Sequence, residues 1–218
     1  MFETIAIDPG EPITIVAALV AVVAAVLLTH PSLDRIGRDA RLWRRVRSLL
    51  PYVDEAARDH GFYTSYTIGA DEVAGVLHVD AYKAGEILRE QGFRTSPLAA
   101  HKEFDGRGEV GSWGRFGPIK PSELPWPLST LYLIAYPYQL HVTLFPDGEG
   151  GVLVTAHREY SPYNPLVAYW HLRGKGLDVD AGVAAVADAL ADSDVYSPSD
   201  RAMELKLEEA AANVEAEI

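Results

Sequence analysis

Residues 138–160 read YQLHVTLFPDGEGGVLVTAHREY and contain the clearest pair of strands in the chain. Apolar and polar residues alternate on both sides of PDGEGG, a turn-forming run, and this pattern predicts a β-hairpin. Because successive residues of a strand point to opposite faces, matching the apolar faces of the two strands sets their register. That register leaves residues 147–151 as the loop and places His141 opposite His157.

The same register gathers imidazoles and hydroxyls on one face of the hairpin, because Thr143 then lies opposite Thr155. Directly opposed Cβ atoms are ~4.5–5.5 Å apart. Two imidazoles at that separation could bind a metal or act as acid and base near neutral pH. The candidate catalytic residues are therefore His141, Thr143 and His157. The alternative is a solvent-facing sheet surface, which His and Thr also suit.

The segment LHVTLF at 140–145 resembles the His-x-Thr-x-apolar motif of two-histidine (2H) phosphoesterases. The resemblance implies two such motifs on neighbouring strands, each pairing its His with a hydroxyl that helps to hold a phosphate. His141 and Thr143 match one copy. The other candidate copy, LHVDAY at 77–82, has Asp80 where the family has the hydroxyl, and an acidic side chain would repel a phosphate.

Outward from the hairpin, the remaining patterns predict an α+β fold: a mostly antiparallel sheet with helices on one face. Further strands are expected at 61–68, 72–79 and 128–135, with another hairpin around DGRGE at 105–109. Asp80 is a good N-cap for a helix that ends before Gly92, and Asp178 or Asp180 for one that ends at Leu190.

Near the N-terminus, residues 13–29 read ITIVAALVAVVAAVLLT and contain no charge. As a helix they would extend ~25 Å, close to the ~30 Å apolar thickness of a bilayer. We therefore predict a transmembrane helix over residues 12–30. A cleaved signal peptide would need a basic flank before the apolar run, whereas this flank is acidic. A buried helix of a soluble core is the third alternative.

The charges on the two sides of this helix differ and predict its orientation. The residues before it include three acids and no Lys or Arg, whereas six arginines follow within 31–47. Basic residues remain on the cytoplasmic side of a membrane, so we expect the N-terminus outside and the domain in the cytoplasm. Residues 31–59 would form a basic amphipathic juxtamembrane helix that lies on anionic headgroups or packs on the following domain. Its membrane-surface residues would be Arg35, Arg38, Arg41, Trp43, Arg44, Arg45 and Arg47.

The composition excludes several classes of site. The chain has 218 residues, a net charge of −12 and no cysteine. Disulfides and cysteine-based metal sites are thus excluded, and an acidic domain is unsuited to nucleic acid, which requires a basic surface. High acidity with few lysines, and phrases such as GFRTSPLAAHKEFDGRGEVGSW, resemble haloarchaeal proteins without an assigned activity. That resemblance implies a type of cell and no function.

These patterns divide the chain into five segments. They are a short extracytoplasmic tail at 1–11, the transmembrane helix at 12–30, the basic helix at 31–59, a cytoplasmic α+β domain at 60–195 and an acidic C-terminal helix at 196–218. The apolar stripe of the last helix, Met203, Leu207 and Val214, could dock a protein partner.

The function predicted from this organisation is that of a single-pass membrane protein rather than an enzyme. Its cytoplasmic domain would bind or scaffold a partner at the membrane, with lipids as the other partner and no cofactor. The alternative is a membrane-tethered hydrolase or phosphoesterase-like enzyme that uses the His141/His157 face. The sequence leaves open whether that face binds a metal.

Overall fold

The antiparallel sheet at the centre of the molecule confirms the predicted α+β fold. The computed structural model describes residues 12–29, 66–96, 99, 102–119 and 123–216. Six strands pair in the order β3-β6-β7-β8-β2-β9, and every pair is antiparallel. Their bounds are β3 Arg94–Thr95, β6 Gly111–Arg115, β7 Tyr138–Pro146, β8 Val152–Tyr160, β2 Val73–Leu77 and β9 Tyr196–Pro198.

The hairpin of β7 and β8 lies in the middle of this sheet and has the predicted register. His141 pairs with His157, and Thr143 pairs with Thr155. The loop of residues 147–151 is closed by Asp147, whose Oδ1 accepts hydrogen bonds from the backbone N–H groups of Glu149 (2.7 Å) and Gly151 (2.9 Å). The turn residues and the matched apolar faces therefore specify the same register, which explains why it could be predicted from the sequence.

Two helices, α5 (Ala81–Glu90) and α8 (Val179–Leu190), cover one face of the sheet, as predicted. Each begins at an aspartate whose carboxylate accepts a backbone N–H: Asp80 from Lys83 (2.9 Å) and Asp178 from Ala181 (3.0 Å). This interaction satisfies one of the amide groups left without a partner at a helix start. The core between the two layers includes Ala84, Leu88, Trp113, Val142, Leu144, Val154, Val183, Val186 and Leu190.

A second, smaller layer covers the opposite face of the hairpin. It consists of the three-stranded sheet β1-β4-β5 (Tyr66–Thr67, Lys102–Phe104 and Arg107–Gly108) and the short 3-10 helix η1 (Ala70–Glu72). The ring of Phe104 in β4 lies 5.8 Å from that of Phe145 in β7. The face that carries the two histidines is therefore buried between layers, and the solvent-facing alternative for it is wrong.

Two expectations about individual elements are corrected by the structure. Residues 128–135 form a helix, α6 (Leu128–Ala135), because the Pro127 carbonyl accepts the N–H groups of Thr130 (3.0 Å) and Leu131 (3.1 Å) in a first helical turn. Around DGRGE, β4 pairs with β5, but the chain then crosses to the larger sheet. There the N–H of Val110 donates to Leu144 (2.8 Å), and β6 pairs with β3 and β7.

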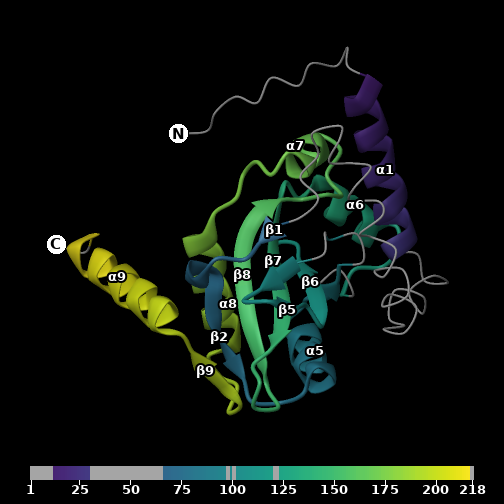
Figure 1. Ribbon diagram of the computed structural model, residues 1–218. Helices are drawn as coiled ribbons and strands as arrows, with labels where there is room; N and C mark the ends of the chain where they lie inside the picture. Colours follow the sequence, from purple (N-terminus) through teal and green to yellow (C-terminus); the bar gives the residue numbers. More distant parts are fainter. Residues whose placement is uncertain (1–11, 30–65, 97–98, 100–101, 120–122, 217–218) are drawn as a thin grey trace.

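The apolar N-terminal segment is helical, as α1 (Pro12–Thr29), and lies beside α6 and α7 (Ala168–Leu172) (Figure 1). Among its described side chains, Ala21, Ala25 and Thr29 are buried, and the hydroxyl of Thr29 is hydrogen-bonded to that of Thr130 in α6. Within the part of the chain that the structure describes, no helix has both the length and the apolar character needed to cross a membrane. The predicted basic helix at 31–59 lies outside the described residues.

The C-terminal segment forms helix α9 (Asp200–Ala216), which extends away from the sheet (Figure 1). The hydroxyl of Ser199 caps it by accepting the N–H of Ala202 (3.1 Å). Ala202 is buried against α8 and the sheet, whereas Met203 and Leu207 are exposed. The side chain of Val214 lies outside the described residues.

Candidate functional site

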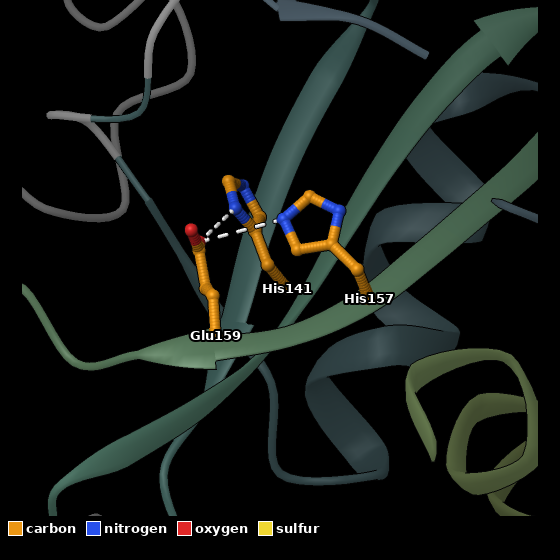
Figure 2. A group of neighbouring side chains, drawn as sticks. All are labelled: His141, His157 and Glu159. Atoms are coloured by element: carbon orange, nitrogen blue, oxygen red, sulfur yellow. Dashed lines mark hydrogen bonds and ion pairs between the residues drawn. The ribbon is translucent and has the colours of Figure 1, made fainter. Parts of the chain in front are cut away.

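The paired histidines and a carboxylate form a compact buried group in the hairpin. His141 in β7 and His157 in β8 are each 3% exposed, and their ring centroids are 5.1 Å apart. Glu159, two residues after His157, points toward both rings (Figure 2). Its Oε1 lies 2.6 Å from Nδ1 of His141 and 3.6 Å from Nε2 of His157. We call these three residues the His–Glu group.

His141 has a polar partner at each ring nitrogen. Nδ1 lies next to Glu159, and Nε2 lies 2.7 Å from Oγ of Ser112 in β6. We assign the ring proton to Nδ1, which donates to the carboxylate, so the Ser112 hydroxyl donates to Nε2. The Nζ atom of Lys102 in β4 is 3.2 Å from Nδ1. Burial, reinforced by this ammonium, lowers the pKa of His141 to about 3 against the opposing effect of Glu159.

His157 is oriented from behind by a second carboxylate. Its Nδ1 lies 2.8 Å from Oε2 of Glu72, the last residue of η1. Glu72 is buried, and its other oxygen accepts the backbone N–H of Gly69 (3.0 Å). Because Nδ1 of His157 faces Glu72, its other ring nitrogen, Nε2, is the one nearer to Glu159.

Glu159 is the anion of the group. Burial by itself would raise its pKa, but the imidazoles of His171, His141 and His157 outweigh that effect and hold the pKa well below its ordinary value. The amide of Gln139 donates to Oε1 (2.7 Å). On the other side, Nδ1 of His171 in α7 lies 3.3 Å from Oε2, without the geometry of a hydrogen bond.

Of the predicted site residues, the structure brings His141 and His157 together. Thr143 lies one pair further along the same face, where its carbonyl accepts a hydrogen bond from Thr155 (3.2 Å). His78, in the second motif copy, lies just beyond β2 and is hydrogen-bonded to Ser197 (2.9 Å). The seven predicted membrane-surface residues, Arg35, Arg38, Arg41, Trp43, Arg44, Arg45 and Arg47, lie outside the described residues.

Sequence reasoning missed most of the polar residues around the two imidazoles. Glu159 and Gln139 had a local signal, because each shares a face with a histidine two positions away in its own strand. Glu72, Lys102, Ser112 and His171 come from four other elements, and their approach depends on how those elements pack. No spacing in the sequence relates them to the hairpin.

Chemically, the site combines two imidazoles with a carboxylate that faces both. One ligand atom from each residue of the His–Glu group lies within 4.8 Å of the others, so these three could hold a metal ion. Without an ion, the His141–Glu159 hydrogen bond holds a proton that could be transferred between base and acid. We found no match to this chain among protein-family models, curated proteins or solved structures.

Proposed function

We propose that the protein attaches to a membrane through α1 and that its sheet domain binds a partner there. The observation that carries this proposal is the distribution of side-chain size around α1. Among the side chains of α1 that the structure describes, the small Ala21 and Ala25 are buried, and most of the large apolar ones are exposed. The exposed ones are Ile15, Leu19, Val20, Val23 and Val26.

This distribution is the reverse of that in a helix of a water-soluble protein, which directs its large apolar side chains into the core. Small residues at a helix contact allow close approach and are typical of helices that pack within lipid. Burial of one large aliphatic side chain is favourable by roughly 1.5–3 kcal/mol. Transfer of the exposed face of α1 into lipid would therefore be favourable by several kcal/mol.

Two further features support the proposal. Leu128 and Leu131 in α6, one of the helices against which α1 packs, are also exposed. In the sequence, six arginines follow α1 within 31–47, and they would bind anionic headgroups. Because basic residues remain on the cytoplasmic side of a membrane, we propose that the domain lies in the cytoplasm. The exposed Met203 and Leu207 of α9 would be available to a protein partner.

Membrane attachment can be measured by flotation of the full-length protein with vesicles of phosphatidylcholine and phosphatidylglycerol. We expect the wild-type protein to float, and the double variant Leu19→Glu/Val23→Glu to bind at least tenfold more weakly, because a charge in the apolar layer costs about 2.5–3.5 kcal/mol at a helix centre. The matched control is Met203→Glu/Leu207→Glu, which makes the same change on exposed residues of α9. It should float like the wild type. Wild-type protein that stays in the aqueous fraction, or equal flotation of the α1 variant, would refute the proposal.

A second proposal is hydrolase or phosphoesterase-like chemistry at the His141/His157 face. The observation in its favour is the hydrogen-bonded series of Ser112, His141 and Glu159, in which a hydroxyl, an imidazole and a carboxylate follow in order. Such a series can activate a hydroxyl or a water molecule as a nucleophile. Thr143 would contribute to the same face without direct contact with Glu159.

A further inference from the structure

We propose that His141, His157 and Glu159 bind a divalent first-row transition-metal ion, with Zn²⁺ and Co²⁺ as probes. The three residues offer two nitrogens and one oxygen within 4.8 Å of one another, on two adjacent strands. Imidazole and carboxylate ligands of this kind suit Zn²⁺ and its neighbours in the first row. This inference goes beyond membrane attachment and does not depend on it.

The separations of the ligand atoms suit such an ion. A metal about 2.0–2.2 Å from each ligand in tetrahedral geometry places the ligand atoms about 3.3–3.5 Å apart. The distance from Glu159 to His157 is 3.6 Å, and that from Glu159 to His141 is 2.6 Å. The ion would lie between Nδ1 of His141 and Glu159, and this pair would open by somewhat less than 1 Å. The ring proton of His141 would then be on Nε2, which would donate it to the Ser112 hydroxyl.

The residues behind the ligands hold them in a binding orientation. Glu72 accepts the Nδ1 proton of His157, so that Nε2 of this ring faces the proposed ion. A carboxylate behind a ligating imidazole is a typical outer contact of metal sites, and its loss typically weakens binding 10–100-fold. Gln139 orients Glu159 in the same way.

A fourth ligand could come from α7. The Nδ1 atom of His171 is buried and lacks a hydrogen-bond partner among the described residues. It lies 3.3 Å from Oε2 of Glu159. Buried polar atoms nearly always have a partner, so an unsatisfied nitrogen beside the Glu159 carboxylate indicates that the group can accept one more interaction.

Some charged residues around the His–Glu group favour binding of a cation, and one opposes it. Two carboxylates, those of the buried Glu72 and the partly exposed Glu159, and one ammonium, that of Lys102, lie against the imidazoles. This excess of carboxylates favours a bound cation. The Lys102 ammonium, however, lies 3.2 Å from Nδ1 of His141, where it would repel the ion. Binding therefore requires Lys102 to turn away, and its removal should strengthen binding.

The test is titration of full-length protein, freed of metal by a chelator, with Co²⁺ and Zn²⁺. We expect one ion per chain, with a visible Co²⁺ absorption band that Zn²⁺ displaces. His157→Ala and Glu159→Gln should weaken binding at least 100-fold, and Glu72→Gln 10–100-fold. The control is His78→Ala, which removes an exposed histidine outside the group and should bind like the wild type.

Lys102→Met distinguishes metal binding from loss of folding, because it should increase affinity at least tenfold. No saturable Co²⁺ binding, wild-type affinity in His157→Ala, or an equal loss in His78→Ala would each overturn the proposal. Flotation of His157→Ala should be unchanged, so failure of the metal site and failure of membrane attachment would be seen separately. If the ion is present, a water molecule on it could become the nucleophile of the proposed hydrolase chemistry.

Discussion

Replacement of Gly182 by alanine is expected to destabilise the protein by about 2–4 kcal/mol, although alanine is the better helix former. A Cβ atom at this position would lie 2.1 Å from Cα of His157 and 2.6 Å from the backbone nitrogen of Arg158. Both atoms belong to the backbone of β8 and cannot turn aside. The helix α8 would have to move away from the sheet and loosen the packing of its buried residues. The helix-propensity gain of about 1 kcal/mol offsets only part of that cost.

Chemical denaturation of Gly182→Ala beside the wild type measures this effect. A matched control on the same helix is Asp188→Ala, at an exposed position, which should change the free energy of unfolding by less than about 0.5 kcal/mol. Unchanged or greater stability of Gly182→Ala would contradict the close approach of α8 to β8. Because the clash falls on the backbone of His157, the variant should also weaken binding of Co²⁺.

Gly182 illustrates which parts of the fold could be predicted from the sequence. The start of α8 could be predicted, because Asp178 precedes apolar residues at helical spacing and its carboxylate caps the first turn. The register of β7 and β8 could be predicted for a similar reason, since the alternation of apolar and polar residues and the loop lie within 23 consecutive residues. The contact of Gly182 with β8 could not be predicted. A glycine within a helix can have several structural roles, and only the packed structure shows that this one allows α8 to approach β8.

The burial of the histidine face depends on elements with almost no sequence signal. The strands β1, β4 and β5 contain two or three residues each, too few for an alternation to be detected. They bring Lys102 over His141, while η1 places Glu72 behind His157. A one-sided sheet was the simplest expectation for the hairpin alone, and the second layer converts its polar face into an interior site.

The error at residues 128–135 has a different origin. Leu, Ile, Thr and Tyr in this segment favour a strand in isolation. In the structure, buried Thr130 and Leu133 lie three residues apart and face the region where α1 packs, which is a helical spacing. Tertiary packing against α1 therefore outweighs the weak local preference.

Acidification of the metal-free protein is expected to lower its stability, starting near pH 6.5. The pKa of His141 is about 3 in the folded protein and 6.5 for an ordinary histidine. Above pH 6.5 the ring is neutral in both states, and its contribution to stability is constant. Below pH 6.5 the unfolded chain gains a proton that the folded protein does not, so stability falls with pH until about pH 3. At 1.36 kcal/mol per pKa unit, the total loss is on the order of 3–5 kcal/mol.

Glu159 adds to this loss at lower pH. Its pKa is held well below the ordinary 4.5, so its stabilising effect is complete above pH 4.5 and is lost as the pH falls through the folded value. Unfolding by denaturant at pH 7.5, 5.5 and 4.5, with a chelator present, measures both parts. His141→Gln should reduce the slope between pH 6.5 and 4.5, whereas His78→Gln should retain it.

The protonation state of the His141 ring, followed as the pH is lowered, provides an independent check of this expected loss of stability. Its imidazole NMR signals should remain those of a neutral ring down to about pH 4.5. A midpoint near pH 6.5 would mean that the ring is open to water and that the second layer does not close over the hairpin. A stability that does not change between pH 6.5 and 4.5 would lead to the same conclusion. A low midpoint would instead show that β7 holds a neutral imidazole beside Glu159, which is the state that a metal ligand requires.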